Sequence, residues 1–137
     1  MKQQLVAFVA VLFAQASIVL GGECPVCAPP QLIEVKEVTV CEREQTTLIC
    51  PRGSTVQIHD AFYGRANPKT CRHPSATEEN QTCSAPEALQ IISKRCTGQR
   101  ECDLAAANFW FVDPCKGINK YLDVSYSCTK SDFSMYY

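Results

Sequence analysis

The chain has 137 residues and a formal net charge of −1 at pH 7, from 13 basic and 14 acidic side chains. This length fits one domain and leaves little room for a second. The near-neutral balance, without a basic stripe, excludes a protein that binds the phosphate backbone of nucleic acids.

Residues 1–21 have the pattern of a secretory signal peptide. A basic start at Lys2 precedes an uncharged run over residues 5–20, which matches the n-region and h-region of such a peptide. A transmembrane anchor is the alternative, because the run approaches the ~20 residues that a membrane helix needs, but no stop-transfer pattern follows. Cleavage after Ala16 and cleavage near Gly21 both fit. We therefore expect a secreted, extracellular protein without a membrane span in its mature chain.

All ten cysteines of the chain follow the predicted signal peptide. At this density they favour the disulfide framework of a secreted protein. A metal site is the alternative, but the chain has only two histidines and a single C-x-x-C motif, from Cys24 to Cys27. Zinc needs four ligands at recognisable spacings. We therefore expect no metal and no cofactor.

Eight of the cysteines fall in one block, residues 38–128, which we predict to be a single domain. Residues 22–37 form a leader that holds Cys24 and Cys27, and residues 129–137 form a short C-terminal tail. The leader pair either closes on itself or links two chains into a disulfide-bonded homo-oligomer, and both options stay open.

Four segments have strand patterns. β-branched residues recur over residues 33–40, and two further candidates, residues 46–50 and 55–63, are separated by a turn signal at residues 51–53. In residues 121–128 apolar and polar side chains alternate, which predicts a strand with one buried face.

One helix is predicted in the second half of the chain. Ser84 as N-cap, Pro86 in the first turn and Glu87 three residues after the cap form a capping box. Residues 88–92 carry an apolar stripe that we assign to core packing. The basic pair at residues 94–95 complements the helix dipole at the C-terminal end. Strands with one helix, crosslinked by disulfides, predict an α+β fold.

A surface loop is predicted over residues 70–82, which are polar and rich in turn formers. The loop ends in the sequon Asn80-Gln81-Thr82. Asn80 is therefore a candidate N-glycosylation site in a secreted protein.

No catalytic motif occurs in the sequence, neither of a zinc protease, nor of a serine hydrolase, nor of a phosphate-binding loop. Two carboxylates such as Glu42 and Asp113 would form a glycosidase pair only at a defined separation, which a sequence does not give. We therefore expect no catalytic residues and a protein that is not an enzyme.

Two motifs are specific in combination: Tyr63-Gly64-Arg65, and the D-P-C-K-G-I-N-K-Y-L run over residues 113–122. Together with Cys41-Glu42 and Ala107-Asn108-Phe109, they resemble the rhamnose- or galactose-binding lectin domain of the sea urchin egg lectin (SUEL) type. The same domain occurs in latrophilin-like receptors. The resemblance covers residues 38–128 and includes all eight cysteines of that block in order.

The resemblance implies a fold and a disulfide pattern. The fold is a short, disulfide-rich antiparallel β-sandwich of the α+β class, with one helix and long loops. Eight cysteines allow 105 pairings. Of these, the family pattern implies Cys41–Cys71, Cys50–Cys128, Cys83–Cys115 and Cys96–Cys102.

The resemblance also implies a carbohydrate-binding site. Its residues here are Glu42, Tyr63, Asn108, Asp113, Gly117 and Lys120. The two carboxylates accept hydrogen bonds from hydroxyl groups, and the lysine and the asparagine donate in return. The glycine lets the backbone approach a ligand, and the tyrosine ring meets an apolar sugar face. No calcium-binding loop is present, so we expect recognition without a metal.

Two departures from the family pattern bear on function. Phe62 replaces an asparagine beside Tyr63, and we expect its side chain to point away from the site because neighbours in a strand face opposite ways. Ile118-Asn119 replaces threonine-tyrosine beside Lys120, which leaves the sugar preference open. We favour a secreted, metal-independent lectin for L-rhamnose- or D-galactose-type glycans. The alternative is an extracellular module that binds a protein or receptor.

Overall fold

The computed structural model describes residues 33–77 and 82–130. The signal peptide, the Cys24/Cys27 pair and Asn80 lie outside the described residues. The elements follow in the order β1 (Val35–Cys41), β2 (Gln45–Ile49), β3 (Ser54–Arg65), β4 (Cys83–Ser84), α1 (Ala88–Cys96), β5 (Glu101–Ala105) and β6 (Tyr121–Lys130). Strands β1 and β6 thus extend past residues 38 and 128, where the sequence placed the domain boundaries.

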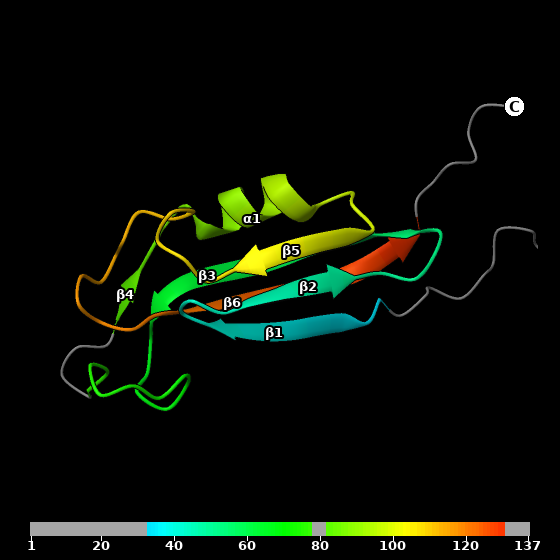
Figure 1. Ribbon diagram of the computed structural model, residues 1–137. Helices are drawn as coiled ribbons and strands as arrows, with labels where there is room; N and C mark the ends of the chain where they lie inside the picture. Colours follow the sequence, from blue (N-terminus) through cyan, green and yellow to red (C-terminus); the bar gives the residue numbers. More distant parts are fainter. Residues whose placement is uncertain (1–32, 78–81, 131–137) are drawn as a thin grey trace, which may run out of the picture. The chain divides into compact units, whose positions relative to one another are not determined.

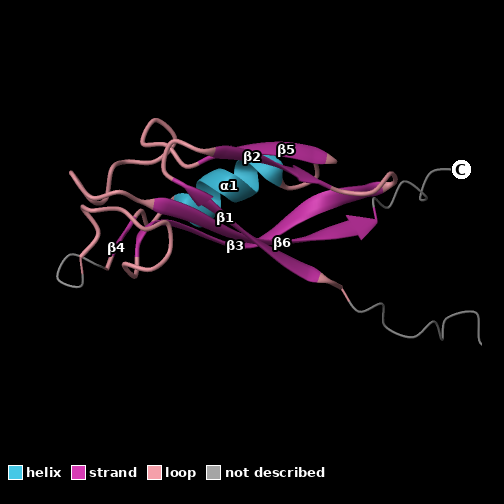
Figure 2. Ribbon diagram, turned by 60° about the horizontal axis from the view of Figure 1, so that its bottom comes forward, coloured by secondary structure: helices cyan, strands magenta, loops and turns pink. Residues whose placement is uncertain are grey.

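The strands form two antiparallel sheets, one in the order β1-β6-β3-β4 and one that pairs β2 with β5. Figure 2 shows α1 and the β2–β5 pair on one side of the larger sheet. A single core cluster fills the space between these layers, with contributions from Leu48 of β2, Ile92 of α1 and Leu122 of β6. The predicted class, a small antiparallel α+β domain with one helix, is confirmed.

A β-bulge decides which side chains of β3 enter this core. Val56 and Ile58 are buried, and the register shifts between Ile58 and Asp60. Strict alternation through all residues of β3 would turn Asp60 and Phe62 inward. Because the bulge takes up one residue, Ala61 and Tyr63 are buried instead. The prediction that Phe62 points away from Tyr63 is confirmed.

The helix exists, but the predicted capping box is wrong. Ser84 belongs to β4 and pairs with Gly64, and the N-cap is Glu87, which makes no capping hydrogen bond through its side chain. The backbone N–H of Ala88 donates to the carbonyl of Ala85 at 3.2 Å, so a turn separates β4 from α1. Among the described residues, no helix is long and apolar enough to cross a membrane.

Four disulfides crosslink the described residues, and they are the four pairs that the resemblance implied. Three of them close segments of 30 to 78 residues, namely Cys41–Cys71, Cys83–Cys115 and Cys50–Cys128. The fourth, Cys96–Cys102, joins the end of α1 to β5. A bridge over tens of residues adds about 2–4 kcal/mol, mainly by restricting the unfolded chain.

Candidate functional site

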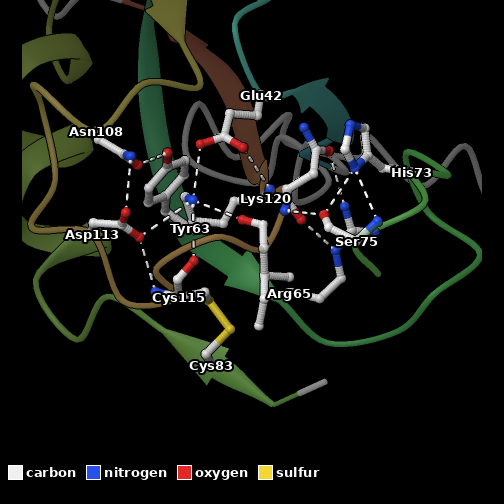
Figure 3. A network of polar contacts seen from close by, with 12 residues as sticks. Glu42, Tyr63, Arg65, His73, Ser75, Cys83, Asn108, Asp113, Cys115 and Lys120 are labelled. Carbon is white, nitrogen blue, oxygen red and sulfur yellow. Dashed lines mark hydrogen bonds and ion pairs between the residues drawn. A yellow bond between two sulfur atoms is a disulfide. The ribbon is translucent and has the colours of Figure 1, made fainter. Parts of the chain in front are cut away.

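A polar cavity of about 220 Å³ lies where loops meet at one end of the larger sheet. Five of the six predicted site residues line it, and Tyr63 is the exception. The complete lining is Glu42, Arg43, His73, Ser75, Asn108, Asp113, Gly117, Ile118, Asn119 and Lys120. Figure 3 shows how side chains from these separate loops converge.

Lys120 lies between the two carboxylates of the cavity. Its Nζ is 2.9 Å from Glu42 Oε1 and 3.3 Å from Asp113 Oδ1, and it donates to the carbonyl of Ile118 at 2.8 Å. Only 3% of the Lys120 side chain is exposed. A buried ammonium is tolerated where opposite charges and hydrogen bonds compensate its lost hydration. We call Glu42, Lys120 and Asp113 the ion triad.

The triad limits what Lys120 can do. An ammonium has three donors, and four acceptors surround it here, namely Glu42, Asp113 and the carbonyls of Cys115 and Ile118. The expected donation from Lys120 to a ligand therefore requires that one of these partners be exchanged. In the structure Lys120 instead holds the two carboxylates in place.

Glu42 is fixed twice. Its backbone N–H donates to the carbonyl of Lys120 at 3.0 Å, and its Oε2 accepts from the backbone N–H of Lys120 at 3.1 Å. Since Glu42 follows the end of β1 and Lys120 precedes β6, the pairing of these two strands brings the residues together.

Asp113 is held as an ionised acceptor. Its Oδ1 accepts from the backbone N–H of Cys115 at 2.9 Å, and its Oδ2 accepts from Asn108 Nδ2 at 3.2 Å. Desolvation alone would raise the pKa of Asp113, but the Cys115 hydrogen bond and the charge of Lys120 outweigh it and lower that pKa below its ordinary value. Asp113 therefore stays ionised at neutral pH and accepts hydrogen bonds.

Tyr63 is the predicted site residue that does not line the cavity, and its ring is buried rather than open to a sugar. The side chain has 0% exposure, and the ring stacks on Phe111 with 4.3 Å between centroids. Burial first, then the charges of Glu42 and Asp113, raise the pKa of Tyr63, so its hydroxyl stays neutral. That hydroxyl donates to Asn108 Oδ1 at 2.6 Å. Tyr63 therefore orients Asn108, whose amide keeps a second N–H for a ligand.

The other two residues of the Y-G-R motif build the loops around the cavity. The buried guanidinium of Arg65 donates to Asn119 through both its carbonyl, at 2.7 Å, and its Oδ1, at 3.1 Å. It also donates to the carbonyls of Asn67, Thr70 and Cys71. Burial lowers the pKa of Arg65, but a guanidinium stays charged in proteins. Arg65 thus joins residues 66–71 to Asn119 without a carboxylate.

Two glycines shape the backbone of the site for different reasons. A Cβ on Gly64 would overlap the carbonyl oxygen of Cys83 and lie 2.8 Å from Ser84 Cα, so only glycine lets β4 approach β3 here. Gly117 has a φ of 78°, which favours glycine, and no protein atom would lie within 4 Å of an added Cβ. The backbone at Gly117 therefore has open space beside it.

Sequence reasoning missed three residues that line the cavity: Arg43, His73 and Ser75. Ser75 Oγ accepts from the backbone N–H of Asn119 at 2.9 Å and lies 2.8 Å from His73 Nδ1, which also accepts from the backbone N–H of Ser75 at 3.2 Å. The neutral ring therefore carries its proton on Nε2. The implied Cys41–Cys71 bridge was the available signal, because it brings the residues after Cys71 close to Glu42.

The cavity suits a small ligand with many hydroxyl groups. Carboxylate acceptors and residues with N–H donors both line it, and its volume lies below the ~300–1,000 Å³ of sites for drug-sized ligands. Within residues 33–77 and 82–130, no group of three or more histidine, cysteine, aspartate or glutamate side chains could hold a metal ion.

Comparisons with known proteins agree with the resemblance seen in the sequence. A family model described as the D-galactoside/L-rhamnose binding SUEL lectin domain matches residues 48–128. The chain is 36% identical over 96 residues to a D-galactoside-specific lectin of Heliocidaris crassispina, which covers 69% of this chain and 91% of the lectin. It is 38% identical over 97 residues to the L-rhamnose-binding lectin ELEL-1 of Echinometra lucunter, with 70% and 93% covered. It is also 38% identical over 88 residues to adhesion G protein-coupled receptor L1 of Mus musculus, where the match covers 64% of this chain and 6% of the receptor.

Proposed function

Because this chain belongs to the SUEL lectin domain family, we propose that it is a secreted protein that binds glycans of the L-rhamnose or D-galactose type. The sugar class rests on the names of two relatives, one specific for D-galactosides and one that binds L-rhamnose. The family and these names favour a binding protein over an enzyme.

The main structural support for glycan binding is the ion triad. Lys120 pairs with Glu42 and Asp113, and the other oxygen of each carboxylate, Glu42 Oε2 and Asp113 Oδ2, accepts one hydrogen bond within the protein and keeps a second lone pair for a hydroxyl group. Residues with donor groups line the same cavity, namely Asn108, Arg43 and His73. A sugar hydroxyl both donates and accepts, so this combination of donors and acceptors suits a pyranose ring.

The binding is proposed to need no metal ion. The Lys120 ammonium occupies the space between two carboxylates in which a calcium-dependent site would place its cation. We expect chelation with EDTA to leave glycan binding unchanged. Loss of binding in EDTA that calcium restores would contradict this part of the proposal.

Secretion is supported by two features of the chain. The N-terminal sequence has the pattern of a signal peptide, and four disulfides crosslink the described residues, as in proteins of oxidising compartments. Expression of the full chain in a secretory host should deliver it to the medium, with a mature N-terminus after Ala16 or near Gly21.

A glycan array on the purified protein tests the sugar specificity. We expect binding to rhamnose- or galactose-terminated glycans that free L-rhamnose or D-galactose competes. Asp113→Asn should lower the affinity about tenfold or more, since it removes a charged acceptor. Asp103→Asn is the matched control, because Asp103 hydrogen-bonds Thr47 on the β2–β5 pair, away from the cavity. A folded wild-type protein that binds no sugar would overturn the proposal.

A protein-binding role is the second candidate, and one observation favours it. Phe109 and Val112 are 78% and 79% exposed in the loop between Asn108 and Asp113. The network of Asn108 and Asp113 holds both ends of that loop. An apolar pair on a fixed loop is typical of a surface that a partner covers.

The two candidates respond differently to competition. A protein partner held by the apolar pair should be released by the double variant Phe109→Ser/Val112→Ser and retained in excess L-rhamnose. A partner that is bound through its glycans should be retained by the double variant Phe109→Ser/Val112→Ser and released by excess L-rhamnose.

A further inference from the structure

A second cavity borders the first. It has a volume of about 440 Å³ and is lined by Pro68, Lys69, Arg72, His73 and Pro74. His73 lines both cavities. A ligand that extends past His73 would therefore pass from the first cavity into the second.

The two cavities differ in charge. In the first, Lys120 and Arg43 are matched by Glu42 and Asp113. In the second, the charged side chains that the structure describes are Lys69 and Arg72, both exposed, and neither forms an ion pair with another described residue. Among the described residues, the lining of the second cavity thus carries positive charge without a paired carboxylate.

The backbone under these cations is held in place. Asn67 Oδ1 accepts from the backbone N–H groups of Lys69 and Thr70, at 2.9 and 2.8 Å. The Cys41–Cys71 disulfide and the guanidinium of Arg65 fix the middle of the loop. Binding then orders few additional groups, which lowers its entropic cost.

We propose that the second cavity is a subsite for an acidic group, a sulfate ester or a carboxylate, that is attached to the galactose- or rhamnose-type residue in the first cavity or belongs to the sugar linked to it. The inference rests on the proposed lectin function and narrows its ligand to acidic glycans. The guanidinium of Arg72 offers a planar fork that matches the oxygens of sulfate and carboxylate, and Lys69 adds a point charge. His73 Nε2–H lies at the boundary between the two subsites.

The test compares lactose, 3′-sulfolactose and 3′-sialyllactose, with methyl α-L-rhamnoside as a second neutral reference. At low ionic strength the wild-type protein should bind one or both acidic lactoses roughly tenfold more tightly than lactose, and salt should reduce this gap. The double variant Lys69→Gln/Arg72→Gln should lose the gap and keep its affinity for the neutral sugars. The two acidic sugars separate sulfate from carboxylate as the preferred group.

The matched control is Arg52→Gln/Lys94→Gln, which removes the same charge from the turn before β3 and from the last turn of α1. This control should keep the preference for acidic sugars. Equal affinity for lactose and both acidic lactoses, or a gap that survives in Lys69→Gln/Arg72→Gln, would overturn the inference and leave the lectin function intact. If the folded protein binds none of the four sugars, the proposed function fails and the inference fails with it.

Discussion

Arg65 and Lys120 are both buried cations at the same end of the sheet, but their partners differ in kind. Arg65 is surrounded by backbone carbonyls and one amide oxygen, while Lys120 pairs with two carboxylates that line a cavity. Carbonyl partners tie loops together and leave nothing for a ligand. Carboxylate partners keep lone pairs that face solvent. Arg65 thus holds the loops of the site together, whereas Lys120 positions carboxylates that can accept hydrogen bonds from a ligand.

The largest effect is expected from Arg65→Ala. The change leaves buried carbonyls without donors and removes the link between residues 66–71 and Asn119, so the free energy of unfolding should fall by about 3–5 kcal/mol. Arg65→Lys should recover only part of this loss, because an ammonium has three donors and no planar fork. Chemical denaturation measures both variants. Full stability of Arg65→Lys would contradict the structural role given to the guanidinium of Arg65.

A smaller loss of stability is expected from Lys120→Met, about 2–3 kcal/mol, because two partly exposed carboxylates lose their counter-ion. Adding Glu42→Gln and Asp113→Asn should restore most of that stability and none of the glycan binding. This result would separate the contribution of the triad to stability from its contribution to glycan binding. Denaturation and glycan binding are measured on the same preparations.

The loss of stability at acidic pH should depend on the protonation of Asp113. Its pKa is lower in the folded protein than the ordinary value of about 3.9. The resulting stabilisation is complete above that value and is lost as the pH falls through the lower folded pKa. Melting temperatures from pH 7 to pH 2 should therefore fall less steeply in Asp113→Asn. An identical acid profile for the two proteins would contradict the role given to this carboxylate.

The smallest effect is expected from Phe62→Asn, which restores the residue typical of the family. Phe62 packs against Tyr121 on the outer face of the larger sheet, with 5.4 Å between ring centroids. Losing that ring pair should cost about 0.5–1.5 kcal/mol, and the affinity for glycans should stay unchanged. A change in sugar specificity would show that the outer face and the cavity are coupled.

Much of the fold could be predicted because its signals are local. The alternation over residues 121–128 predicts β6, and the apolar stripe over residues 88–92 predicts α1. The short β4 was missed because two residues give no periodicity, and β5 was missed because its exposed positions are Glu101 and Asp103, residue types that are rare in strands. The start of α1 was misplaced because Ser84 resembles a helix cap but is engaged by β3.

The site could be predicted in part, through motifs rather than periodicity. The D-P-C-x-G-x-x-K run located Asp113, Gly117 and Lys120, which the structure places in one cavity. The inward direction of Tyr63 could not be predicted, because the bulge in β3 has no clear sequence signature. His73 was missed although the Cys41–Cys71 bridge, which the resemblance implied, brings its loop to Glu42.

The bulge at residues 58–60 has one more consequence, which concerns how this protein can change over evolutionary time. Before the bulge, β3 contributes to the core through even-numbered positions, and after it through odd-numbered ones. The two halves of the strand are thus out of phase by one residue. Loss of the extra residue itself would straighten β3 and keep Ala61 and Tyr63 inward, whereas loss or gain of a residue between the bulge and Tyr63 would turn Phe62 inward and move Tyr63 away from Asn108. The length of β3 between the bulge and Tyr63 is therefore under stricter selection than the identity of its outward-facing residues, which are free to diverge.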